Sequence, residues 1–478
     1  MFRTDHVFNG GLPMSTYRTP ANYIRGRQDP ENVDVVTQAI LKCLGALGTK
    51  EQKEQAYFLW ALRQFGDYHA SDKRDHIFAA VAFCGPFFKR AGVPLPVVPD
   101  YSMTVQEVYT AVAANLLGSM PLLTVLSYVD QRKKKIQDLP SWVPDFSVPF
   151  ANNMLIARGF AADSVEAITD EDTGLLRVGA ELKPIYDASG ATEPEDGDAD
   201  EQPRARAAGN HLHVLGAAFD TITEVCPASF DTIAELRYTP YLEFILDMPE
   251  MYEGTYESRE EALWRTLTGN YDNGTSSYPA ESRVGFIFRQ HVLDNMTISL
   301  LDNMSELGKY SFLDDLTESD EGDASWIPSA GEVMSNATTI MFKVFMAIGG
   351  SGAPGGGLPG LGTNMETLIN TVSQMESEES VLAELEMLPM IGQGMSVPDR
   401  RLYLTERGYL GLGPSTTQEG DEVWVLKGAR VPFVLRWPET PTSEVERQLV
   451  GETYLHGFMD GEMLVEEQCS SLEEAILV

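Results

Sequence analysis

Short apolar runs separated by glycine turns follow one another after about residue 395, and this pattern most restricts what the chain can fold into. The runs are 402–404 (LYL), 423–426 (VWVL), 431–435 (VPFVL) and 454–455 (YL). Runs of this length, rich in valine, leucine and aromatic residues, are typical of strands joined by tight turns. We therefore expect a small antiparallel sheet or barrel, a C-terminal β-rich domain over residues 396–478.

The first 150 residues show helical spacing instead. Apolar side chains recur every three or four residues over 35–47, from Ala56 up to Gly66, and over 105–116, which predicts amphipathic helices. Thr104 and Glu107 stand at the start of the third stretch, where they can form a capping box. Residues 1–150 are thus expected to be a helical region.

The middle of the chain, residues 151–395, mixes the two patterns. Short strands are expected at 175–178 and 213–215, and helices return over 230–310. The segment 189–209 is acidic and has no large apolar residue, so we expect a mobile, disordered insertion. The glycine-rich stretch 349–362 lacks the pattern of a phosphate-binding loop and is expected to be a flexible linker or lid-like loop. The whole is predicted to be an α+β fold.

Charge excludes one class of partner. The chain has 71 acidic and 35 basic side chains, a formal net charge of −36, which repels phosphate backbones, so no nucleic acid is expected to bind. The one dense basic run, residues 132–135 (RKKK), is interpreted as a solvated loop. No secretory signal and no apolar stretch long enough for a membrane span is found, and the four cysteines are widely spaced. We expect a cytoplasmic protein that does not bind a membrane.

No catalytic pattern in the sequence is complete. The tripeptide at 172–174 (DTG) has a charged flank and no second copy with which to share a proton. His211 and His213 could share one face of a strand, but no third metal ligand accompanies them. No Gly-x-Ser-x-Gly elbow is present. The sequence therefore predicts no catalytic residue, no cofactor and no metal site.

Two ordered sets of motifs carry more information than these patterns. The first set lies at 71–79 (SDKRDHIFA), 98–102 (VPDYS), 105–109 (VQEVY), 126–129 (LSYV) and 139–147 (LPSWVPDFS). The second lies at 400–405 (RRLYLT), 408–414 (GYLGLGP), 420–426 (GDEVWVL), 432–436 (PFVLR) and 450–462 (VGETYLHGFMDGE), with a weaker motif at 215–222 (LGAAFDTI).

In order and spacing, both sets resemble the fungal heterokaryon-incompatibility (HET) family. The departures in the first set are mild: Lys73 where proline is usual, His76 for lysine and Phe146 for tryptophan. The family's N-terminal domain, which resembles the TIR fold and is marked by motifs such as LSYxWG and WIDxxCINQ, has no counterpart here. The chain therefore resembles the region downstream of that domain, and activities tied to the domain are not carried over.

The motif positions are expected to be structural. Trp142 is interpreted as an anchor that docks the chain, with ligand stacking as the alternative. Arg74, beside Asp75, could pair with Asp100 or Asp145 in an ion-pair network, with a catalytic centre as the alternative. Gly408, Gly411 and Gly413 suit turns that need positive φ, and Asp460-Gly461 suits a hairpin. The full set is Arg74, Asp75, Asp100, Tyr101, Trp142, Asp145, Gly411, Gly413, Pro414, Asp421, Gly457, Asp460, Gly461 and Glu462.

Three functions remain open at this point. The first is a non-catalytic HET-family protein in fungal non-self recognition or programmed cell death signalling, acting through contacts with other proteins, among them full-length relatives. The second is an accessory protein or unrecognised enzyme of a fungal secondary-metabolic gene cluster. The third is the truncated product of a HET-domain gene.

Overall fold

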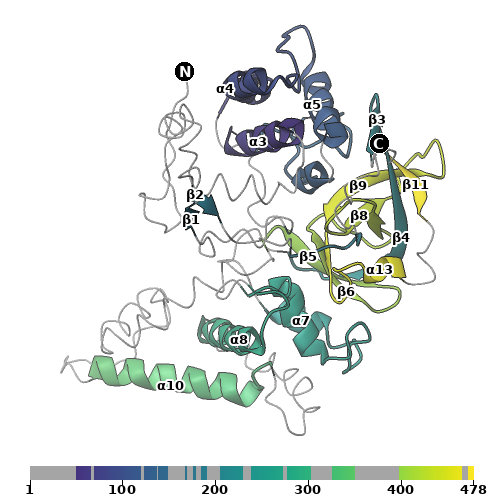
Figure 1. Ribbon diagram of the computed structural model, residues 1–478. Helices are drawn as coiled ribbons and strands as arrows, with labels where there is room; N and C mark the ends of the chain where they lie inside the picture. Colours follow the sequence, from purple (N-terminus) through teal and green to yellow (C-terminus); the bar gives the residue numbers. More distant parts are fainter. Residues whose placement is uncertain are drawn as a thin grey trace. The chain divides into compact units, whose positions relative to one another are not determined.

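The computed structural model describes residues 50–65, 69–119, 123–136, 138–148, 155, 167–169, 176–178, 185–190, 205–229, 238–272, 277–302, 326–349, 398–465 and 472–478 (Figure 1). These residues fall into two compact units. The first contains residues up to Thr221 together with Thr416–Tyr454 and Phe458–Val478, and the second contains Ile222–Ser415 and Leu455–Gly457.

Three helices and a 3₁₀ turn form the helical part of the first unit. They are α3 (Lys50–Phe65), α4 (Asp75–Ala91), α5 (Val105–Ser119) and η1 (Thr124–Tyr128). The apolar stripe of α5 is buried, as its spacing predicts. At its start, the backbone N–H of Thr104 donates to the Glu107 carboxylate (2.7 Å) and the Glu107 N–H donates to the Thr104 hydroxyl (3.2 Å). The predicted capping box is confirmed.

Five strands close into a barrel in the same unit. They are β4 (His211–Val225), β7 (Glu422–Leu426), β8 (Phe433–Arg436), β9 (Glu446–Glu452) and β11 (Glu473–Leu477). Neighbouring strands pair in the order β4-β7-β8-β9-β11, and β11 pairs with β4 again, so the ring has no open edge. All these pairings are antiparallel except the short parallel one between β9 and β11.

The strand β4 comes from the middle of the chain, about two hundred residues before its partner β7. Residues 211–216 pair with β11 on one side and with the short strand β3 (Ala205–Ala208) on the other. The segment 189–209 was expected to be a disordered insertion, and this is wrong for its last residues. Pairing with β4 satisfies the backbone of β3, which its small side chains cannot stabilise by burial alone.

The remaining elements of the first unit are short. The strands β1 (Ala167–Thr169) and β2 (Leu176–Val178) form a separate antiparallel pair, as expected for the second of them. The two-residue strand β10 (Tyr454–Leu455) follows β9 at the boundary of the units, since Leu455 already belongs to the second one. The one-turn helix α13 (Glu462–Val465) comes after it in the first unit.

The second unit holds helices and one small sheet. Its helices are α6 (Thr239–Phe244), α7 (Arg259–Thr268), α8 (Ser282–Asp302) and α10 (Ala330–Gly349). The last residues of β4 pair with β5 (Arg400–Thr405), which pairs with β6 (Leu410–Pro414). Trp264 of α7 and Phe288 of α8 are fully buried among these helices. The helical pattern expected over 230–310 is confirmed where the structure describes it.

The glycines of β6 differ from expectation. Only Gly408 has the positive φ of a turn (+81°), whereas Gly411 and Gly413 lie inside the strand, opposite Tyr403 and Arg401. A Cβ on Gly411 would overlap the aromatic ring of Tyr403. Gly411 is therefore required for close approach of a side chain, not for a turn.

The expected hairpin at Asp460-Gly461 is also wrong. Gly461 does adopt a positive φ (+95°), but the turn leads into α13 and not into a strand. The backbone N–H of Asp460 donates to the Glu462 carboxylate (2.7 Å), so both residues belong to the start of that helix turn.

The α+β class, with helices first and an antiparallel sheet at the end, is confirmed. The division at residues 150 and 395 stays a prediction. The helix expected at 35–47, the tripeptide at 172–174 and nearly all of the glycine-rich stretch 349–362 lie outside the described residues. Among the helices that the structure describes, none is long and apolar enough to cross a membrane.

Closure of the barrel by β4 predicts that residues 396–478 do not fold alone. Without residues 211–221, β7 and β11 each lose a pairing partner, and a row of buried backbone groups is left unsatisfied. A fragment of 396–478 should show no cooperative urea transition by circular dichroism. Adding a peptide of residues 205–225 should restore one, and cooperative unfolding of the fragment without the peptide would contradict the closed ring.

Replacement of Gly411 tests the contact with Tyr403. Gly411→Ala should lower the free energy of unfolding by about 2 kcal/mol, because the added methyl forces the Tyr403 ring to move within a packed sheet. Gly118→Ala is the matched control: this exposed helical glycine has open space around its Cβ, so the variant should be unchanged or up to about 1 kcal/mol more stable. Urea denaturation measures both, and equal stability of the two variants would refute the assignment.

Candidate functional site

The proline-rich segment 139–147 is held in shape by Asp145. One carboxylate oxygen of this buried residue accepts the backbone N–H groups of Lys135 (2.8 Å) and Ile136 (3.1 Å). The other accepts the backbone N–H (2.9 Å) and the hydroxyl (2.7 Å) of Ser147. Four donors thus satisfy the buried charge, and Asp145 makes no ion pair with Arg74, contrary to expectation.

Trp142 is fully buried in the same segment. Its indole N–H donates to the backbone carbonyl of Asn210, in the turn between β3 and β4, at 2.9 Å. An indole with both its apolar body and its single donor occupied by the protein has nothing left for stacking on a ligand. The geometry supports the docking role of Trp142.

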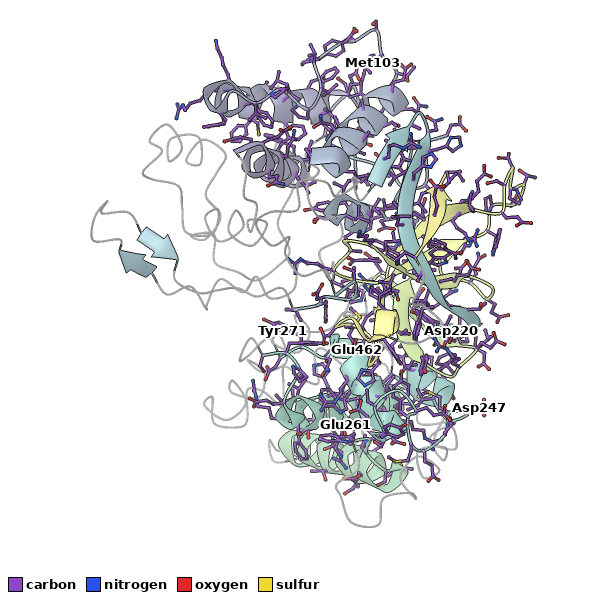
Figure 2. All side chains as sticks on the ribbon, turned by 45° about the vertical axis from the view of Figure 1, so that its right-hand side comes forward. Met103, Asp220, Asp247, Glu261, Tyr271 and Glu462 are labelled. Atoms are coloured by element: carbon purple, nitrogen blue, oxygen red, sulfur yellow. The ribbon has the colours of Figure 1, made fainter. Side chains whose placement is uncertain are left out.

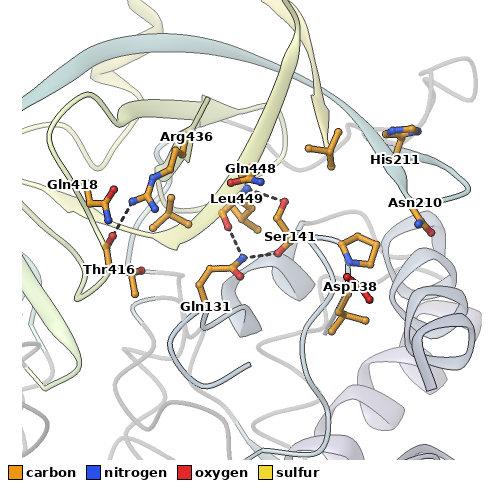
Figure 3. A pocket seen from close by; sticks show the side chains of 14 residues that line it. Gln131, Asp138, Ser141, Asn210, His211, Thr416, Gln418, Arg436, Gln448 and Leu449 are labelled. Carbon is orange, nitrogen blue, oxygen red and sulfur yellow. Dashed lines mark hydrogen bonds between the residues drawn. The ribbon is translucent and has the colours of Figure 1, made fainter. Parts of the chain in front are cut away.

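Ser141 ties the segment to the barrel. Its backbone N–H donates to the Val478 carbonyl (2.8 Å), and its hydroxyl accepts the backbone N–H of Leu449 in β9 (2.9 Å). The carboxamide of Gln131 donates to the carbonyls of both Ser141 (2.8 Å) and Leu449 (2.5 Å) (Figure 3). The segment therefore contacts the barrel at β9, at the end of β11 and at the turn before β4.

Lys134 corrects the interpretation of residues 132–135 as a solvated run. Its ammonium donates to the carbonyls of Pro140 (2.8 Å) and Ser141 (3.0 Å) inside the fold. Burial lowers the pKa of Lys134 to about 7, against the opposing effect of the negative charge on Asp145. The sequence carries no signal of this, because nothing in a run of basic residues indicates which one turns inward.

A pocket of about 600 Å³ opens beside this segment, within the first unit (Figure 3). One wall is the segment itself with Gln131, another is β9, and a third is the turn that precedes β7. Its lining residues are Gln131, Asp138, Leu139, Pro140, Ser141, Asn210, His211, Thr416, Gln418, Arg436, Gln448, Leu449, Val450 and Val478.

Arg436 lines the pocket beside the turn that precedes β7, and Asp421 holds its guanidinium in place. The guanidinium of Arg436 makes two hydrogen bonds to the buried Asp421 carboxylate (2.7 and 2.8 Å) and one to the Thr416 carbonyl (2.8 Å). This pairing raises the pKa of Arg436, against its partial burial. Asp421 also accepts the backbone N–H of Gln418 (2.8 Å), which fixes the turn. The pair is closed and structural.

The motif residues of α4 form a second, separate group. Arg74 pairs with Asp72 (2.6 Å) and not with Asp100, and it also donates to the carbonyls of Tyr101 and Met103 (2.7 Å each). The Tyr101 hydroxyl donates to Asp75 (2.7 Å). The expected ion-pair network around Arg74 exists, but the predicted partner of Arg74 was wrong. Asp72, two residues earlier in the same turn, pairs with the guanidinium in place of Asp100.

A third group, in the second unit, contains a motif residue that was not singled out. The imidazole of His456 bonds to the Glu257 carboxylate, which also pairs with Arg265 (3.3 Å). Burial raises the pKa of Glu257, but the bond to His456 and the nearby positive charges together lower it by more. The net shift of the pKa is therefore downward. Gly457 follows with φ +84°, and a Cβ there would press on Thr255.

The structure thus distributes the predicted residues over several places. None of the predicted residues lines the pocket: Trp142 and Asp145 belong to the segment that forms one of its walls, and Asp421 bonds to the lining residue Arg436. Arg74, Asp75, Asp100 and Tyr101 lie at the start of α4 and in the loop that precedes α5, and Gly411, Gly413 and Pro414 lie in β6. Sequence reasoning missed the pocket residues Gln131, Asn210, Gln418 and Gln448, which carry no motif of their own.

Metal ligation has no geometric basis in the described part of the chain. No group of three or more His, Cys, Asp or Glu side chains there could hold a metal ion. His213 bonds to Glu474 (2.8 Å), and His211 lies apart from it in the lining of the pocket.

The buried amine of Lys134 predicts a specific pH dependence. Between pH 7 and 10.5 the unfolded chain holds a proton on Lys134 that the folded chain has lost, so this group makes the free energy of unfolding rise with pH. The slope is at most about 1.4 kcal/mol per pH unit. Urea denaturation at pH 7, 8 and 9 should show the stability of the wild type increasing relative to Lys134→Met. Lys135→Met, which removes the same charge from an exposed neighbour, should run parallel to the wild type, and parallel behaviour of Lys134→Met would contradict the burial.

Two stretches of the chain are similar to known proteins. Residues 374–472 match the family model described as the Het-6 beta-barrel domain. A stretch of 64 residues is 47% identical to Heterokaryon incompatibility protein 6, OR allele, of Neurospora crassa, and it covers 13% of this chain and 9% of that protein. No solved structure matches.

The matched range includes the barrel strands β7, β8 and β9, whereas β4 and β11 lie outside it. The structure therefore adds two strands that the family match does not cover, one of them from the middle of the chain. The two matches and the motif order agree with each other: residues 374–472 are similar to the Het-6 beta-barrel domain, and the chain resembles the heterokaryon-incompatibility family.

Proposed function

We propose that this chain acts without catalysis in fungal non-self recognition or programmed cell death signalling, through contacts with other cytoplasmic proteins. The Het-6 barrel match supports the biological setting. Full-length members of the same family are the partners that we propose first. The chain spans only 9% of the length of the relative that it matches, so that protein's own activity is not assigned to it.

The observation that carries this proposal is the loop between α4 and α5. Val98 and Tyr101 of the VPDYS motif are 71% and 58% exposed. Figure 2 marks this loop by Met103. An exposed valine and tyrosine three residues apart on one loop are suited to bury apolar area against a partner.

The same loop is rigid. Arg74 holds two of its carbonyls, and the Tyr101 ring stacks edge-on against Phe78 with centroids 5.0 Å apart. The Asp100 carboxylate accepts the backbone N–H of Ser102 (2.8 Å), which lowers the pKa of Asp100. A loop already fixed in one conformation loses little entropy when it binds, so this stiffness favours recognition.

The polar motif residues support a non-catalytic role as well. Asp145 is saturated by four donors, Asp421 is closed by Arg436, and Arg74 is closed by Asp72 and two carbonyls. Groups whose hydrogen-bonding capacity is already used internally hold the fold together and have little left for a substrate.

Expression in a filamentous fungus tests the proposal. Overproduction of the chain should arrest growth or kill hyphal compartments in strains that carry a full-length HET-family gene. The double variant Val98→Ser/Tyr101→Ser should lose this effect. Its thermal unfolding temperature should fall only slightly, because both side chains are more than half exposed, although Tyr101→Ser removes the contacts of Tyr101 with Phe78 and Asp75. Colony growth and vital staining are the measurements.

The matched control is Met251→Ser/Tyr256→Ser, which removes an equally exposed pair outside the family motifs. It should behave as the wild type. Indifference of the host to the wild-type chain, or equal effects of the two double variants, would overturn the proposal. Consumption of NAD by the purified protein above background would instead favour an enzyme.

A further inference from the structure

The pocket of the first unit has an unusual set of polar groups. Four of its lining side chains are carboxamides, namely Gln131, Asn210, Gln418 and Gln448. A carboxamide offers a donor and an acceptor side by side. Among the described residues, the carboxamides of Asn210, Gln418 and Gln448 have no hydrogen-bond partner in the protein, so their capacity is available to a ligand.

The charge of the pocket argues against an anionic ligand. Its one guanidinium, on Arg436, is already paired with the buried Asp421 carboxylate at two positions. Asp138 adds a negative charge to the lining. A phosphate or carboxylate would have to compete with Asp421 for Arg436 and would be repelled by Asp138. The charged groups of the pocket therefore disfavour an anionic ligand.

The apolar part of the lining restricts the class of ligand further. Leu139, Pro140, Leu449 and Val450 contribute aliphatic surface. The fourteen lining residues include no Phe, Tyr or Trp, and their only aromatic ring is the small imidazole of His211. Sugars and nucleobases are commonly held by stacking on aromatic rings, whereas aliphatic surface with carboxamides suits a chain of small apolar side chains and amide groups.

A peptide has this composition. Each peptide unit carries one N–H donor and one C=O acceptor, which is the pattern that a carboxamide complements. The volume of about 600 Å³ lies within the range of roughly 300–1,000 Å³ typical of ligand pockets. That space holds a few residues in extended conformation.

We propose that this pocket binds a short, uncharged, extended peptide segment of a partner protein, whose backbone amides pair with Asn210, Gln418 and Gln448. The inference rests on the proposed function, because it supplies a second contact site for a protein partner besides the loop between α4 and α5. The pocket differs from that loop because it is polar and concave. Ser141 and Trp142 place the pocket wall, so the LPSWVPD motif acts as its positioning element.

Fluorescence anisotropy with the full-length chain tests the pocket. The probe is a fluorescein-labelled pool of blocked tetrapeptides built from Ala, Val, Ser and Pro, with an amidated C-terminus. Binding should be saturable, and Gln448→Leu and Gln418→Leu should each weaken it by up to about ten-fold through loss of one hydrogen bond. Gln418→Trp, which fills the pocket with an indole, should abolish binding.

The matched control is Gln290→Leu, the same change at an exposed position on α8 outside the pocket. It should bind as the wild type. Competition adds two arms, maltose for a carbohydrate site and inorganic phosphate for an anion site, and displacement by either would overturn the peptide assignment.

Absence of saturable binding, or binding that Gln418→Trp leaves intact, would also overturn the proposal. The measurement is made on purified protein and does not depend on a fungal host. Peptide binding together with an indifferent host would therefore reject the proposed function alone, and growth arrest without peptide binding would reject the pocket alone.

Discussion

Closure of the barrel by β4 is the constraint on which the first unit depends. A sheet of four strands from the C-terminal part of the chain would leave the backbones of β7 and β11 unpaired, and β4 satisfies both at once. Because β4 arrives from the middle of the chain, it brings the turn at Asn210 with it, and that carbonyl receives the Trp142 indole. This contact adds to those that Ser141 and Gln131 make with β9 and with the end of β11.

The proline-rich segment shows how a polar structure is kept inside a protein. Asp145 and Gln131 satisfy backbone groups that have no strand or helix partner, and each hydrogen bond replaces one that water would otherwise make. Lys134 is the exception, since its charge is only weakly opposed by Asp145 and its pKa falls accordingly. The pocket lies where this segment and β9 cannot pack completely against each other.

Function follows from what the motif residues leave unoccupied. Their charges are engaged inside the fold, whereas Val98, the exposed face of Tyr101 and the carboxamides of Asn210, Gln418 and Gln448 remain available. A rigid exposed loop and a polar pocket are both means of contacting another molecule, as the proposed function requires. The two surfaces differ in chemistry and are open to independent tests.

Local patterns in the sequence determined the helices, the capping box at Thr104 and Glu107, the C-terminal strands and the resemblance to the heterokaryon-incompatibility family, because these depend on neighbours within a few residues. The tertiary structure alone decided which strand closes the barrel, why Gly411 must be glycine, which carboxylate meets Arg74 and that Lys134 turns inward. The physical reason is that pairing and burial between distant segments depend on where the chain returns in space, and residue spacing along the chain does not record this.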